Sequence, residues 1–130
     1  MVELPDNLKD EFFRGIDEFN SRKFFDCHET LEDVWREYLE TDRELIQGII
    51  QIAVAYYHLG RDNQLGAKKL FARGLPRVKK YGSNHFGLRL DNFVHKVEED
   101  SFALESESGL IEKQFHIPII TIIGSENDCS

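Results

Sequence analysis

Two histidines, one glutamate and two glutamines have spacings that would place them on facing edges of neighbouring helices. On a helix that turns about 100° per residue, His28, Glu32 and Trp35 lie within about 60° of one another. Apolar side chains flank them, so these groups are expected to point towards the core and Trp35 to be largely buried. An ionisable group that faces a core needs a partner, because an unpaired buried one costs several kcal/mol. The segment therefore marks a candidate site.

A second polar line follows on the next predicted helix. Gln47, Gln51 and His58 lie within about 40° of each other on a helix of 3.6 residues per turn. The short turn near residues 40–42 favours an antiparallel arrangement of the two helices, in which this edge meets His28 and Glu32. The sequence thus predicts an inter-helix cluster of two imidazoles, a carboxylate and two amides.

Three interpretations of this cluster are open. It is a buried hydrogen-bond network that fixes helix register, or a pocket for a small ligand or peptide with Trp35 as its apolar wall. Alternatively it is a metal site, because the His28-x-x-x-Glu32 spacing suits two ligands on one helix face and His58 can supply a third. In a hydrolytic metal site Glu29 would be the general base, although it equally suits a solvated surface acid.

Other catalytic patterns are missing from the sequence. Glu32 and Arg36, spaced four residues apart, are expected to form an ion pair, or Arg36 holds an anionic ligand. Cys27 and His28 cannot act as nucleophile and base together, because adjacent helical residues point about 100° apart. The chain has no Gly-x-Ser-x-Gly and no phosphate-binding glycine loop. Solvated loop or surface positions are expected for His85, His95 and His116.

Apolar residues recur with a helical period in five segments, at about residues 6–19, 23–39, 41–60, 63–76 and 91–104. Asp6 and Asn63 are expected to cap the first and fourth helices, and Thr41 and Glu44 to form a capping box on the third. The third should be central, because apolar residues surround most of it. In the fourth, Leu65 is expected to face inward, and Pro76 to kink or end the helix. Residues 81–87 are expected to form a loop.

The tail has a different composition from the helical segments. Residues 117–123 are β-branched and apolar, and Pro118 rules out a central strand. An extended strap over the bundle is expected, with a dimer contact as the alternative. We therefore expect an all-α fold: a compact bundle of about five helices in residues 1–106, with an extended tail, packed or partly disordered, in residues 107–130.

Composition limits the class of protein. A chain of 130 residues with 41% hydrophobic and 31% charged residues is typical of one globular domain. A net charge of −8 argues against nucleic-acid binding, which needs a basic face. No apolar run approaches the roughly 20 residues of a membrane span, and the acidic N-terminus does not resemble a signal peptide. A cytoplasmic protein is therefore expected.

The two cysteines and the absence of cofactor motifs limit the chemistry further. Cys27 and Cys129 form no disulfide framework and lack metal-ligand spacing, so Cys27 is expected to be a small core residue. No cofactor is implied. The expected partner is a small ligand or a protein, and the chain is expected to be a monomer or a homodimer.

The joint pattern of these motifs resembles the uncharacterised helical family catalogued as domain of unknown function 309. The resemblance covers roughly residues 8–104 and rests on Phe19-Asn20, residues 25–35, residues 47–53, His58 and residues 63–70. It implies a compact helical bundle with no established activity. The family often has glycine where Arg22 and Asp62 stand, and usually no proline at position 76. Arg22 is therefore expected to adopt a turn conformation that glycine takes more easily.

From these observations we expect a binding or interaction module that uses the cleft between the second and third helices. The alternative is a metal-dependent hydrolase with a site of His28, Glu32 and His58.

Overall fold

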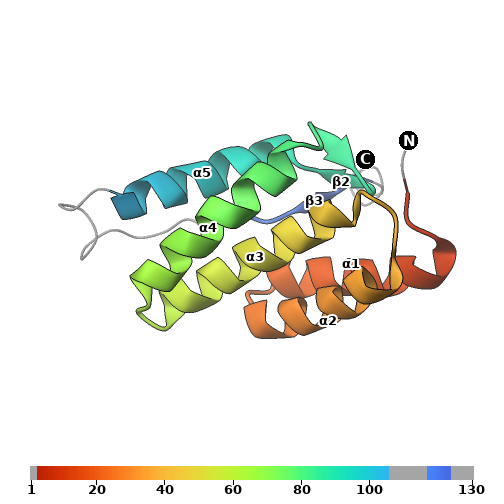
Figure 1. Ribbon diagram of the computed structural model, residues 1–130, viewed down its shortest axis with the longest axis horizontal. Helices are drawn as coiled ribbons and strands as arrows, with labels where there is room; N and C mark the ends of the chain where they lie inside the picture. The colour runs from red at the N-terminus through yellow and green to blue at the C-terminus, as the bar shows by residue number, and fades with distance from the viewer. Residues whose placement is uncertain (1–2, 106–116, 124–130) are drawn as a thin grey trace.

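The five helices of the described residues form two antiparallel hairpins and a last helix that packs on the second hairpin (Figure 1). A computed structural model describes residues 3–105 and 117–123. The first hairpin comprises α1 (Asp6–Asn20) and α2 (Phe24–Glu37), the second comprises α3 (Arg43–Gly60) and α4 (Gln64–Lys79), and α5 is Asp91–Glu105. The predicted all-α fold is confirmed. Within the described ranges, no helix is both long and apolar enough to cross a membrane.

The turns of the two hairpins have the same backbone conformation. Arg22 has a φ of 66° and Asp62, forty positions later, a φ of 63°. In the first turn the N–H of the residue after Arg22 donates to the Glu18 carbonyl oxygen at 2.8 Å, and the bond from Asn63 to His58 is its counterpart at the same length. The left-handed region favours glycine, so the conformation predicted for Arg22 is confirmed.

Helix α3 is central to the core, as its apolar circumference predicted. Six of its apolar side chains are fully buried: Leu45, Ile46, Ile49, Ile52, Ala53 and Ala55. It lies closest to α4 where two glycines face each other, since a Cβ at Gly74 would lie 2.9 Å from the Gly48 carbonyl oxygen. Cys27 is also fully buried, which confirms its expected place in the core.

A short hairpin stands where a loop was predicted. Strands β1 (Asn84–His85) and β2 (Leu88–Arg89) pair antiparallel around Phe86 (φ 52°) and Gly87 (φ 77°). Two positive φ angles are typical of a tight hairpin turn, for which Asn-Gly is the usual sequence. Here Phe86 stands in place of the asparagine, so the sequence lacks the usual hairpin signal. The buried Phe86 ring makes edge-on contacts with Phe12 and Tyr38.

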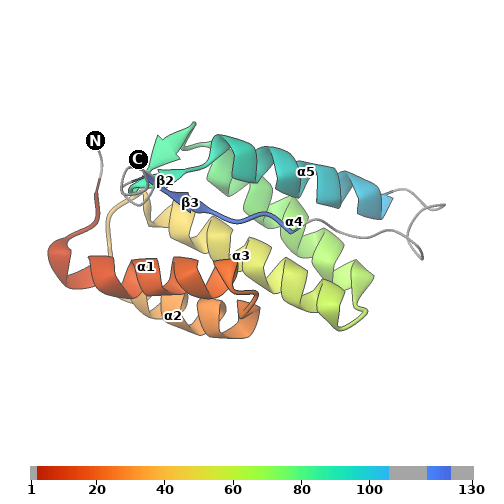
Figure 2. The same ribbon diagram turned by 180° about the vertical axis from the view of Figure 1, so that it is seen from behind.

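The described part of the tail, residues 117–123, is extended and adds a third strand. Strand β3 (Thr121–Ile122) pairs antiparallel with β2 at the edge of the sheet β1-β2-β3, so Pro118 precedes the strand. Figure 2 shows this segment crossing the bundle towards β2. Residues 106–116 and 124–130, also predicted as tail, lie outside the described residues.

Two predicted helix starts are wrong and one is confirmed. Asp6 is the first residue of α1 rather than its cap, because Pro5 occupies the N-cap position. The capping box on α3 does not form, since the Glu44 carboxylate binds Lys80, the residue after α4, at 2.9 Å instead. Asn63 does cap α4, because its Oδ1 accepts the Gly66 N–H at 3.0 Å.

Two expectations for α4 need correction. Pro76 does not end the helix, which continues to Lys79; the alternative, a kink at Pro76, stays a prediction. Pro76 and Ala72 are exposed, so the Ala72 carbonyl that proline leaves without a helical donor lies on the solvent side. Leu65, expected to face inward, is 64% exposed because it lies in the first turn of α4, at the end of the bundle.

Candidate binding groove

Helices α2 and α3 run antiparallel side by side (Figure 1). A small cavity between them has a volume of about 220 Å³ and is lined by Glu32, Trp35, Gln47, Ile50 and Gln51; we call this cavity the groove. Four of these are predicted site residues. They meet because the turn between the helices is short and their spacing keeps each set on one helix edge.

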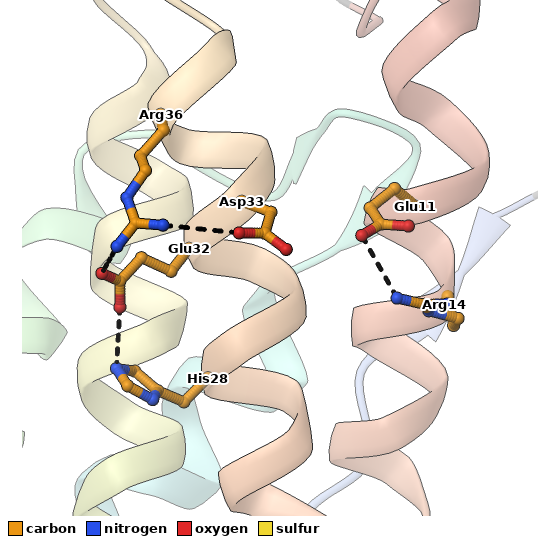
Figure 3. Close-up of polar contacts among 6 residues, drawn as sticks. All are labelled: Glu11, Arg14, His28, Glu32, Asp33 and Arg36. Carbon is orange, nitrogen blue, oxygen red and sulfur yellow. Dashed lines mark hydrogen bonds and ion pairs between the residues drawn. The ribbon is translucent and has the colours of Figure 1, made fainter.

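The Glu32 carboxylate is held between two residues of its own helix (Figure 3). His28 Nε2 lies 2.9 Å from one carboxylate oxygen, and Arg36 donates to the other at 2.7 Å. Asp33 accepts a longer contact of 3.5 Å from Arg36. The predicted pair of Glu32 and Arg36 is therefore present. Because all these side chains are at least 30% exposed, each contact contributes about 1 kcal/mol or less to stability.

Four polar atoms on these two helices are buried without a hydrogen-bond partner among the described residues. They are Nδ1 of His28, Nε1 of Trp35, Nε of Arg43 and Oε1 of Gln51. A buried donor or acceptor left unpaired costs about 1–3 kcal/mol. The polar side chains around the groove therefore do not form a network that satisfies itself.

Trp35 is only partly buried, although it was predicted to be largely buried. The Arg43 guanidinium carbon lies 3.7 Å from the centroid of its ring. The ring packs against the core from the edge of the bundle. This cation–π contact covers one face of the indole and contributes roughly 0.5–1 kcal/mol at an exposed position. Trp35 thus forms an apolar wall of the groove.

His58 lies away from the groove, in the last turn of α3. Its Nδ1 is 3.3 Å from the side-chain nitrogen of Asn63, and its ring carbon would lie 3.0 Å from a Cβ at Gly66. In the part of the chain that the structure describes, no three His, Cys, Asp or Glu side chains are grouped to hold a metal ion. The structure therefore does not bring His28 and Glu32 together with His58.

Glu29 faces a different hollow, on the outer side of α2. It is exposed and lines a depression of about 550 Å³ that His28, Glu32 and Arg36 share with residues of α1. Figure 3 shows Glu11 of α1 across from Asp33, with its own partner Arg14 at 3.2 Å. Glu29 and the groove are thus on different sides of the Glu32 carboxylate.

A polar contact that sequence reasoning missed ties β1 to the turn between α2 and α3. His85, expected to be solvated, has a 14% exposed side chain, and its Nε2 lies 2.9 Å from Asp42 Oδ2. The other Asp42 oxygen accepts the Tyr38 hydroxyl at 2.6 Å. Burial, and then this carboxylate, raise the pKa of Tyr38. Local sequence patterns could not predict the contact between His85 and Asp42, because the two residues are 43 positions apart.

Comparison with known proteins finds a family match that begins within α1 and ends in the first half of α4. Residues 12–70 match the model of the family described as Domain of unknown function (DUF309). The match confirms the resemblance that the motifs predicted, and it contains every residue of the groove. The Uncharacterized protein YpuF of Bacillus subtilis (strain 168) is 45% identical over 56 residues. The aligned stretch covers 42% of this chain and 32% of that relative, so the chain spans about a third of the relative's length.

Proposed function

We propose that the chain is an interaction module whose groove takes one side chain of a partner protein. The volume of about 220 Å³ supports a single side chain, because sites for whole small molecules have volumes of about 300–1,000 Å³. Protein interfaces commonly place one anchor side chain in such a hollow.

The lining indicates the chemistry of that anchor. Ile50 and Trp35 supply apolar walls for an aliphatic stem, while Glu32 supplies acceptor oxygens. Gln51 lines the same hollow, and its Oε1 has no donor within the described residues. A lysine or arginine side chain combines an apolar stem with a donor head that matches these acceptors. The net charge of −8 also favours a basic partner. The buried Gln51 oxygen is the observation that carries this proposal.

The test uses single-residue probes and nuclear magnetic resonance. We expect the N-acetyl methylamides of lysine and arginine, at millimolar concentration, to shift the Trp35 indole and the Gln47 and Gln51 amide signals. The matched norleucine probe has a similar stem without the charged head, and should shift them much less. Gln51→Leu should weaken the response to the lysine probe. Equal responses to lysine and norleucine, or no response from these three side chains, would contradict the proposal.

The hydrolase alternative gains no support from the geometry. It requires His28, Glu32 and His58 to converge, with Glu29 as base, whereas His58 lies in the last turn of α3 beside Asn63. No observation on the described residues favours it over the interaction module.

A further inference from the structure

Residues 117–123, which we call the strap, bind to the end of α1 through the side chain of Asn20. This side chain forms the two hydrogen bonds to the strap backbone that a neighbouring strand would form. The Asn20 side-chain nitrogen donates to the Ile120 carbonyl at 3.0 Å, and the Ile120 N–H donates to Asn20 Oδ1 at 2.7 Å. Both polar groups of one strap residue are thus satisfied by one side-chain amide, about 100 positions away in the sequence.

The remaining polar contacts of the strap are also made to its main chain. Arg22 donates to the carbonyls of Ile117 at 2.8 Å and Pro118 at 3.4 Å. At the other end, the Ile123 N–H donates to the Gly87 carbonyl at 2.8 Å. The site therefore recognises an extended backbone, with Ile120 as its main buried side chain at 1% exposure.

The strap is packed tightly on one flank only. Beside α5 it leaves a cavity of about 350 Å³, which it lines together with Asn92 and Lys96. Ile119 is 58% exposed, and only Pro118 and Ile120 among the seven strap residues are buried. Figure 2 shows the strap as a single extended segment that is not enclosed between two sheets. Few contacts therefore have to break for it to leave its site.

We propose that the strap site also accepts the strap of a second copy of the chain, so that two chains exchange residues 117–123. Each copy carries both the site and the segment that fits it, so the contacts of Asn20, Arg22 and β2 form equally well between chains. Exchange of an identical element is a low-cost route to a dimer for this reason. Within one chain the strap has the advantage of high effective concentration, so exchange should become visible when the intramolecular contact is disabled.

The test disables the contact in two complementary ways in the full chain. Asn20→Ala combined with Arg22→Gly removes the site and keeps the strap, and the glycine suits the left-handed turn. Ile120→Asp removes the buried strap residue and keeps the site. We expect the two variants to form a one-to-one heterodimer when mixed, observed by native mass spectrometry, whereas each alone stays monomeric at the same concentration.

Two controls make the outcome decisive. Mixing the Ile120→Asp chain with a chain that carries all three substitutions should give no heterodimer. Circular dichroism melts check that each variant is folded, and Ile120→Thr replaces Ile120→Asp if the latter unfolds.

Independently, a labelled synthetic peptide of residues 117–123 should bind the folded Ile120→Asp chain, whose site is intact, at least about tenfold more tightly than it binds the wild-type chain. Absence of the heterodimer, or equal peptide affinity for both chains, would overturn the proposal.

Discussion

The two hairpin turns share a backbone conformation and use their side chains in opposite ways. At the α3–α4 turn, Asn63 caps α4 and contacts His58, so its polar groups are used within the hairpin. At the α1–α2 turn, Asn20 and Arg22 reach out to the strap instead. The second turn is therefore complete by itself, whereas the first depends on a segment from the far end of the chain. The α3–α4 turn thus only connects its two helices, whereas the α1–α2 turn also binds the strap.

The hairpins also differ in what limits their helix spacing. In the second, the neighbour of a Cβ at Gly74 would be backbone, the Gly48 carbonyl oxygen at 2.9 Å. In the first, a Cβ at Gly15 would lie 2.5 Å from Cδ2 and 2.8 Å from Cγ of the buried Leu31 side chain. The close approach in the second hairpin is thus made by backbone, and that in the first by a side chain.

The largest effect on stability is expected from Tyr56, whose side chain contacts both hairpins. Its ring contacts Phe19 of α1, Phe24 of α2 and Phe71 of α4, and its hydroxyl donates to Asp100 at 2.7 Å. Burial, and then Asp100, raise the pKa of Tyr56 above that of an unfolded tyrosine, about 10.

Because the raised pKa belongs to the folded state, the stabilisation is complete below about pH 10 and is lost as the pH rises further. Urea unfolding at several pH values should show stability falling by up to about 1.4 kcal/mol per pH unit from this group. Tyr56→Phe should remove that part of the slope, and an unchanged slope would refute the assignment.

The next largest effect distinguishes the two hairpins by their glycines. Gly74→Ala should cost about 1–3 kcal/mol, because backbone atoms of α3 must move to admit the methyl group. Gly15→Ala should cost less, because the methyl group there displaces side-chain atoms of Leu31 rather than backbone. Gly60→Ala is the control, since a Cβ there meets nothing within 4 Å. Chemical unfolding of the three variants measures the order, and a cost for Gly15→Ala equal to that for Gly74→Ala would erase the distinction.

The smallest effect on stability is expected from replacing the two residues with a positive φ, Arg22 and Asp62, by glycine. Asp62→Gly should stabilise the chain by roughly 0.5–1 kcal/mol, because glycine adopts a positive φ without strain. Arg22→Gly gains the same relief but loses the contacts to the strap carbonyls, so its net change should be smaller or negative. Thermal unfolding of both variants gives the difference. If Arg22→Gly gained as much as Asp62→Gly, the strap contacts would contribute nothing.

Sequence reasoning predicted best where the physical signal is local. Helical periods gave the five helices, and the approach of Gln47 and Gln51 to Glu32 and Trp35 followed from spacing and a short turn. His58 shares their angular position, yet it lies at the end of α3 beside Asn63, which angular position alone cannot show. The contact of His85 with Asp42 and the clamp of Asn20 on Ile120 join distant positions, so no periodic pattern marks them.

The central claim is that the groove is a binding site rather than a network that fixes helix register. Stability of Gln51→Leu tests it most directly, because Gln51 carries a buried oxygen without a donor among the described residues. A binding site sacrifices stability for its polar groups, so leucine should leave the free energy of unfolding unchanged or raise it by up to about 1 kcal/mol. The same variant should lose its response to the lysine probe. A loss of about 1–3 kcal/mol in urea unfolding would instead show that Gln51 belongs to a structural network, and would contradict the account.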